Sequence, residues 1–226
     1  MSESIKPILD SLDRCTPDEQ LRVLAWLRAR HPIHTLEATF GTTAEVILEA
    51  IARASDLSQR GVLGLIAEAS FKVNVIDRLV GWQIDPPVGD EPFDFRIRSG
   101  DQTVRIQVKR QRLVNGVPMR FGRGSTLYVA ETQRSRKGKD KKTGEDTRPY
   151  RFGEFDILAV SMQPATGDWT IFRFTPQRWL IPRRENPKYL QVLQPVSLDP
   201  NDNWSADLLT CVDWHIRGEL RRIREA

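Results

Sequence analysis

The chain has 226 residues, 39% of them hydrophobic, and a formal net charge of +4. This composition is typical of a globular domain with a sizeable core, and no apolar run approaches the ~20 residues that would cross a bilayer. The two cysteines, Cys15 and Cys211, lie far apart and support neither a disulfide framework nor a zinc site. We therefore expect a cytoplasmic protein without a membrane partner.

Residues 1–57 are predicted to form a helical N-terminal region. Thr16-Pro17-Asp18-Glu19 combines an N-cap, a proline at the first helical position and a capping-box glutamate. The same capping-box pattern at Thr42-Thr43-Ala44-Glu45 predicts the start of a second helix. The mixed charge of this region leaves three roles open: dimerisation, DNA contact and structural support.

A longer helix is predicted from Ser58 to about Val80. Its apolar residues form one stripe at helical spacing, made of Val62, Ile66, Ala69, Val73, Ile76 and Val80. Glu68 lies beside this stripe, and Lys72, four residues further on, is its possible ion-pair partner.

Residues 93–112 are predicted to contain a β-hairpin, with strands at 93–98 and 103–109. Apolar and polar residues alternate through Val104, Ile106 and Val108, which is the pattern of a half-buried strand. Asp94 and Lys109 lie at the ends of the hairpin, where charged side chains near a core are costly unless they serve a site. A surface salt bridge between them is the simpler alternative.

The remaining chain is predicted to add three strands, at 125–131, 155–162 and 169–174, a turn at 164–168, a mobile loop at 133–149 and a C-terminal helix at 203–226. Together with the hairpin, these elements predict a catalytic domain at residues 58–226. Its expected fold class is α/β, with a mixed central β-sheet flanked by helices.

The residues of the hairpin suit a metal-dependent phosphodiesterase. Mg²⁺ prefers oxygen ligands, which Asp94 and the backbone carbonyl of Val108 can supply. Lys109 shares a strand face with Gln107, because side chains alternate along a strand. A lysine beside the metal can orient the attacking water and stabilise developing negative charge.

The string Asp94, twelve residues, Gln107-Val108-Lys109 resembles the PD-(D/E)XK nuclease superfamily in its QxK variant. The middle acidic residue of the motif is replaced by Gln107. The resemblance covers about residues 58 to 175 and implies a restriction endonuclease-like fold and Mg²⁺ as cofactor. It implies Asp94, Gln107, Lys109 and Glu68 as catalytic residues, and Asp94, Val108 and Glu68 as metal ligands. Gln107 alone is equally typical of an ordinary strand residue.

Basic residues gather directly after the hairpin, as expected for a protein that binds a polyanion. Between Arg105 and Arg123 there are six basic residues and no acidic ones. A solvated basic surface is the alternative. The candidate contacts to double-stranded DNA are Arg110, Arg112, Arg120, Arg123, Arg134, Arg136, Lys137 and Lys139.

The sequence therefore predicts a Mg²⁺-dependent DNA endonuclease, with a type II restriction enzyme as the first interpretation. A homodimer is expected, because a two-fold symmetric site needs two cuts. Two alternatives stay open: a structure-selective nuclease of the resolvase or repair type, and a non-catalytic DNA-binding module that has lost its metal affinity.

Overall fold

The computed structural model describes residues 5–85, 87, 89, 91–134 and 148–223. The chain divides into two units, Met1–Gln59 and Arg60–Ala226. The sequence-based boundary after residue 57 lies two residues before this division.

The first unit consists of short helices: α1 (Lys6–Leu12), α2 (Pro17–Arg28), α3 (Leu36–Phe40) and α4 (Ala44–Ala52). Helix α2 begins with the predicted capping box, in which Thr16 and Glu19 exchange side-chain and backbone hydrogen bonds. The capping box predicted at α4 is wrong, because Thr43 makes no side-chain cap. The Glu37 side chain caps this helix start instead, by accepting a hydrogen bond from the Ala44 N–H at 2.7 Å.

Helix α5 (Asp56–Asn74) is the predicted long helix, but it buries a different face. Ile66 and Val73 from the predicted stripe are 41% and 59% exposed, whereas Ala67 and Phe71 are fully buried. Glu68 follows Ala67 on the edge of this buried face. The helix also ends earlier than predicted, and a short 3₁₀ turn, η1 (Ile76–Arg78), follows it.

A five-stranded mixed sheet forms the centre of the second unit, in the order β1-β2-β3-β7-β8. Its strands are β1 (Gln83–Asp85), β2 (Phe95–Ser99), β3 (Gln102–Arg110), β7 (Ile157–Ser161) and β8 (Phe172–Pro176). The β2–β3 hairpin is antiparallel, as predicted, and β3 pairs in parallel with β7. The predicted mixed α/β architecture is confirmed.

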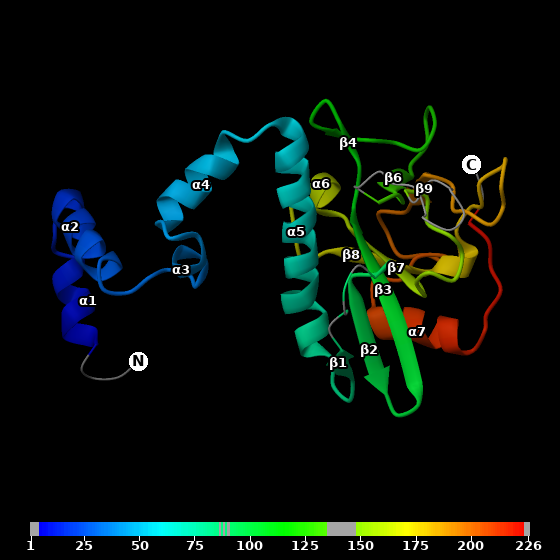
Figure 1. The fold of residues 1–226 in the computed structure, drawn as a ribbon, viewed down its shortest axis with the longest axis horizontal. Coiled ribbons are helices and arrows are strands. Elements are labelled where there is room, and N and C mark those ends of the chain that lie inside the picture. The colour runs from blue at the N-terminus through cyan, green and yellow to red at the C-terminus, as the bar shows by residue number, and fades with distance from the viewer. Residues whose placement is uncertain (1–4, 86, 88, 90, 135–147, 224–226) are drawn as a thin grey trace. The chain divides into compact units, whose positions relative to one another are not determined.

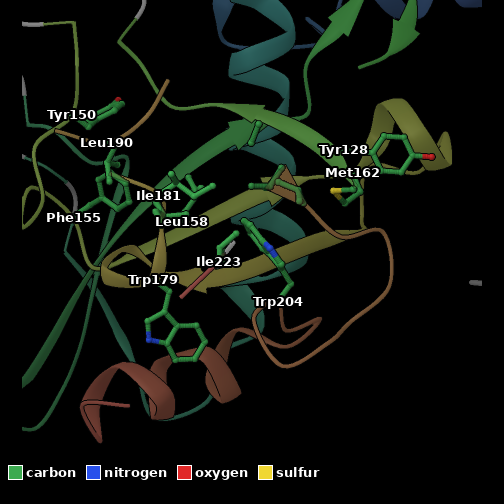
Figure 2. Close-up of a cluster of buried hydrophobic side chains, with 14 of the residues drawn as sticks. Tyr128, Tyr150, Phe155, Leu158, Met162, Trp179, Ile181, Leu190, Trp204 and Ile223 are labelled. Atoms are coloured by element: carbon green, nitrogen blue, oxygen red, sulfur yellow. The ribbon is translucent and has the colours of Figure 1, made fainter. Parts of the chain in front are cut away.

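Two hydrophobic clusters cover the two faces of this sheet. On one face, Phe71 from α5 and Leu208 from α7 (Leu208–Ile216) pack against Ile106, Val108 and their neighbours, and Figure 1 shows α5 running alongside the sheet. The other face carries Leu158 and Val160. It packs against a small antiparallel sheet of β6 (Tyr128–Glu131) and β9 (Leu193–Val196), together with the aromatic residues of Figure 2. The central strands are therefore buried on both sides.

The remaining elements are short: β4 (Leu113–Val114), β5 (Val117–Pro118), α6 (Gln163–Thr166) and η2 (Gln177–Trp179). Helix α6 occupies part of the predicted 164–168 turn. Helix α7 is much shorter than the predicted helix at 203–226. Asp207 caps its start by accepting from the Thr210 N–H at 2.7 Å, and Gly218, with a left-handed φ of 70°, stops it.

No helix among the described residues is long and apolar enough to cross a membrane.

Replacing Phe71 with alanine should destabilise the second unit by about 3–5 kcal/mol, because the ring is fully buried against Phe95 and Phe172. Chemical denaturation followed by tryptophan fluorescence measures the loss. Val73→Ala, on the exposed face of the same helix, is the matched control and should cost about 0.5 kcal/mol or less. Equal losses for the two variants would contradict the buried face described above.

Candidate functional site

The candidate site forms where strand β2 stops pairing with strand β3. The Asp94 N–H makes the last backbone contact, to the Ile106 carbonyl at 3.0 Å. Along a strand, every second residue directs its N–H and C=O to the same neighbour, so Val108 also faces the side of β2. Its N–H is bonded by the Asp94 side chain, whose Oδ2 accepts it at 2.7 Å. A carboxylate thus substitutes for the missing strand.

Gln107 lies opposite Asp94 and is only 2% exposed. Its amide nitrogen donates to Asp94 Oδ2 and also to the Val108 carbonyl, the latter at 3.1 Å. Its amide oxygen accepts from the Tyr150 hydroxyl at 3.1 Å. All hydrogen-bonding atoms of this buried amide are therefore paired.

Tyr150 is a site residue that the sequence reasoning missed. It lies beside Phe155 at the margin of the aromatic cluster, with its hydroxyl directed away from that ring (Figure 2). Lys109 Nζ and the Arg134 guanidinium each lie 5.3 Å from its ring centre. No local pattern identifies Tyr150, because it joins Gln107 across 43 positions of sequence.

Glu68 reaches the same centre from helix α5. Desolvation raises the pKa of its carboxyl to about 7, the charge of Asp94 adds to the rise, and the charge of Lys109 opposes it. Burial also raises the pKa of Asp94, against the opposing influence of Lys109, the Val108 N–H and the Gln107 amide. Two partly desolvated carboxyl groups and one ammonium group therefore interact at one end of the sheet.

The sequence left two simpler alternatives: an ion pair between Glu68 and Lys72, and a hairpin salt bridge between Asp94 and Lys109. Lys72 bonds both carboxylate oxygens of Asp77, at 2.7 and 2.8 Å, so its ion pair is with Asp77. The hairpin salt bridge is not among the ion pairs of the described residues, and the Lys109 ammonium instead faces the Tyr150 ring.

The donor set fits a hard divalent cation. Asp94 Oδ2 and the Val108 carbonyl are both within bonding reach of one nitrogen atom of Gln107, so a small cation could contact both oxygens. A cation would also stabilise the ionised forms of Asp94 and Glu68, which burial disfavours. No group of three or more His, Cys, Asp and Glu side chains suited to a metal occurs in the described part of the chain. A metal here would therefore rely on two carboxylates, a backbone carbonyl and retained waters.

The structure places the predicted DNA contacts in different environments. Arg110 donates to Gln163, Arg112 pairs with Glu131, and Arg134 pairs with Glu154. Arg120 stacks on Tyr128 at 3.8 Å, and Arg123 is exposed. Arg136, Lys137 and Lys139 lie outside the described residues.

Arg112 also lines a cavity of about 800 Å³ on the β6–β9 side of the unit. Glu131 and Gln133 lie on the same wall, and both bond within it: Glu131 accepts from Arg112 and from Gln133. The guanidinium of Arg112 is therefore less available to phosphate than the sequence suggested.

No protein-family model matches the sequence, and no curated protein matches it. Among solved structures, the chain is similar to a bacterial homing endonuclease, I-Ssp6803I, with 16% sequence identity and a TM-score of 0.40. The similarity covers 70% of this chain and 96% of that one.

Glu68 should make stability depend on pH. Its pKa is about 7 in the folded protein and near 4.5 in the unfolded chain, so the folded state binds the proton more tightly. The cost of the buried charge is absent below pH 4.5, grows between pH 4.5 and 7, and is complete above pH 7. Without divalent metal, Glu68→Gln should therefore be more stable than wild type at pH 8, by about 1 kcal/mol after allowance for solvent screening.

The measurement is urea denaturation in EDTA at pH 4.5 and pH 8, with Asp77→Asn, in the η1 turn after α5, as the control carboxyl. The gain for Glu68→Gln should shrink towards zero at the lower pH. A gain that is the same at both pH values would rule out the proposed titration.

Proposed function

We propose that this protein is a Mg²⁺-dependent endonuclease that hydrolyses phosphodiester bonds of double-stranded DNA, and specifically a type II restriction enzyme. The observation that carries the proposal is the end of the β2–β3 ladder. At this strand end lie the Asp94 carboxylate, the Val108 carbonyl and the Lys109 ammonium. The Glu68 carboxyl interacts electrostatically with Asp94 and Lys109. Mg²⁺, when bound, would polarise a phosphoryl oxygen and lower the pKa of a bound water.

The residues of this chain would have distinct roles. Asp94 and the Val108 carbonyl would hold the metal, and Glu68 would bind it directly or through a water. Gln107 would complete or order the ligand shell. Lys109 would orient the attacking water by hydrogen bonding and stabilise the extra negative charge on the phosphorus centre in the transition state.

Phosphate binding would use the basic residues that follow β3. Arg120 and Arg123 follow β3 in sequence, and both side chains are exposed. Phosphate contacts of this kind supply sequence-independent affinity and orient the duplex. A two-fold symmetric cut would need a second centre, so we also propose that the protein acts as a homodimer.

One observation favours a second candidate, a non-catalytic DNA-binding module. The amide nitrogen of Gln107 donates to both oxygen atoms that a metal would need, and each of its bonds would have to break before a metal could bind. A structure-selective nuclease of the resolvase or repair type shares the same centre and differs only in its substrate.

Plasmid DNA incubated with the protein and MgCl₂ should be cut, and both Asp94→Ala and Lys109→Ala should lower the rate by at least about 100-fold, as is usual for the loss of an electrostatic or acid–base group. Lys72→Ala, which removes a surface lysine paired with Asp77, is the matched control and should cut at the wild-type rate. Gel electrophoresis measures the products.

The products also separate the candidates. Discrete fragments from fixed positions support restriction, and preferential cutting of branched DNA supports a resolvase. DNA binding without cleavage in MgCl₂ or MnCl₂ supports the non-catalytic module. Wild-type cutting by both the Asp94 and Lys109 variants would refute the assigned centre.

Arg123→Ala should weaken DNA binding to a similar degree for all sequences, because a phosphate contact carries no base information. The slope of log affinity against log salt concentration should become shallower by about 0.9. Fluorescence anisotropy in CaCl₂, with specific and unrelated duplexes, measures both quantities. Arg217→Ala, which removes an exposed arginine paired with Asp213, is the control and should leave the slope unchanged.

A further inference from the structure

The side-chain amide of Gln107 occupies the place between two candidate metal ligands. Its nitrogen contacts Asp94 Oδ2 and the Val108 carbonyl oxygen. An –NH₂ group carries partial positive charge and donates two hydrogen bonds, so it pairs with both oxygens as a small cation would. The amide nitrogen thus supplies the positive partner that these two oxygens would otherwise find in a metal ion.

The same amide can present the opposite atom to this position. Rotation of the amide by 180° about its last carbon–carbon bond exchanges the places of Nε2 and Oε1. The oxygen atoms of Gln107, Asp94 and Val108 would then face one point. Three oxygen atoms without a positive partner repel one another, whereas a divalent cation prefers such a set.

Tyr150 allows both orientations. Its hydroxyl donates to Gln107 Oε1 in the structure, and a hydroxyl can equally accept a hydrogen bond from an amide nitrogen. Phenylalanine at this position would leave a buried amide atom without a partner. The ring is held by Phe155 at a perpendicular angle of 90°, so the hydroxyl stays in place while the amide turns.

We propose that Gln107 is a cation-sensitive switch: its amide nitrogen bridges Asp94 and Val108 in the metal-free protein, and its amide oxygen turns to bind the metal when Mg²⁺ arrives. Tyr150 is the positioning residue that supports both states. The inference rests on the proposed metal-binding function and specifies how the site changes when it is loaded. It explains how an uncharged glutamine can serve as a ligand in a metal site that has few carboxylates.

Solution NMR of the full-length, ¹⁵N-labelled protein tests the switch without reference to activity. The Gln107 –NH₂ signals are assigned by their loss in Gln107→Met, or by selective perturbation in Tyr150→Phe if that variant does not fold. On titration with MgCl₂ alone, these two signals should shift, because their acceptors change from a carboxylate and a carbonyl to a phenol. The side-chain signals of Gln194, a buried amide bonded to Ile181, should stay fixed.

Calorimetry of Mg²⁺ binding tests the role of Tyr150. Tyr150→Phe should bind Mg²⁺ about tenfold more weakly, because the unpaired N–H of the turned amide costs more than the unpaired amide oxygen left in the metal-free state. Tyr128→Phe, at another buried tyrosine of the same cluster, is the matched control and should bind within about twofold of wild type. Equal affinity in the Tyr150→Phe and wild-type proteins would refute the positioning role.

The outcomes separate this inference from the proposed function. Saturation with Mg²⁺ while the Gln107 signals stay fixed would overturn the switch and leave the nuclease proposal intact. Failure to bind Mg²⁺ at millimolar concentration would overturn both. Shifts of the Gln107 signals together with weaker binding by Tyr150→Phe would support the switch.

Discussion

The constraint on which the site depends is the early end of the β2–β3 ladder. A strand that loses its neighbour leaves backbone groups unpaired, and such groups are costly in a buried position. At Val108 these groups are an N–H and a C=O that face the same side. The Asp94 carboxylate pairs with the first and the Gln107 amide with the second. The polar cluster therefore follows from the need to complete the hydrogen bonding of a central strand.

The position of the cluster is fixed by packing on both faces of the sheet. Strand β3 is paired with β7 on its other edge, in a register that aligns Val108 with Ala159. One face of β3 is covered by Phe71 from α5, which brings Glu68 to the same end of the sheet. The opposite face carries Gln107 and meets Tyr150. A rigid strand between two cores can hold charged groups at fixed separations, which a surface loop cannot do.

The sequence predicted the individual helices and strands better than it predicted which of them pack together. Alternation identified β3 and its pairing with β2, because the two strands are adjacent in the chain. Apolar periodicity misjudged α5, whose buried face uses the small Ala67 beside the large Phe71, while Val73 and other aliphatic residues of the predicted stripe are exposed. The spacing of apolar residues shows which helix face is apolar, but it does not show which face packs against the sheet. Tyr150 was not predictable for the same reason: its role comes from a contact made by folding.

The candidate site also shows why a glutamine can stand where a carboxylate is more usual. Desolvation already raises the pKa of both Asp94 and Glu68, and the charge of Asp94 raises that of Glu68 further. A third carboxylate at position 107 would lie directly against Asp94 and would increase this repulsion in the metal-free protein. A neutral amide avoids the added charge, and its nitrogen donates to Asp94 Oδ2 and to the Val108 carbonyl oxygen. Its oxygen remains a ligand of the kind that Mg²⁺ accepts. In the proposed metal site, Gln107 would therefore stabilise the metal-free fold, whereas a third negative charge would attract a cation more strongly.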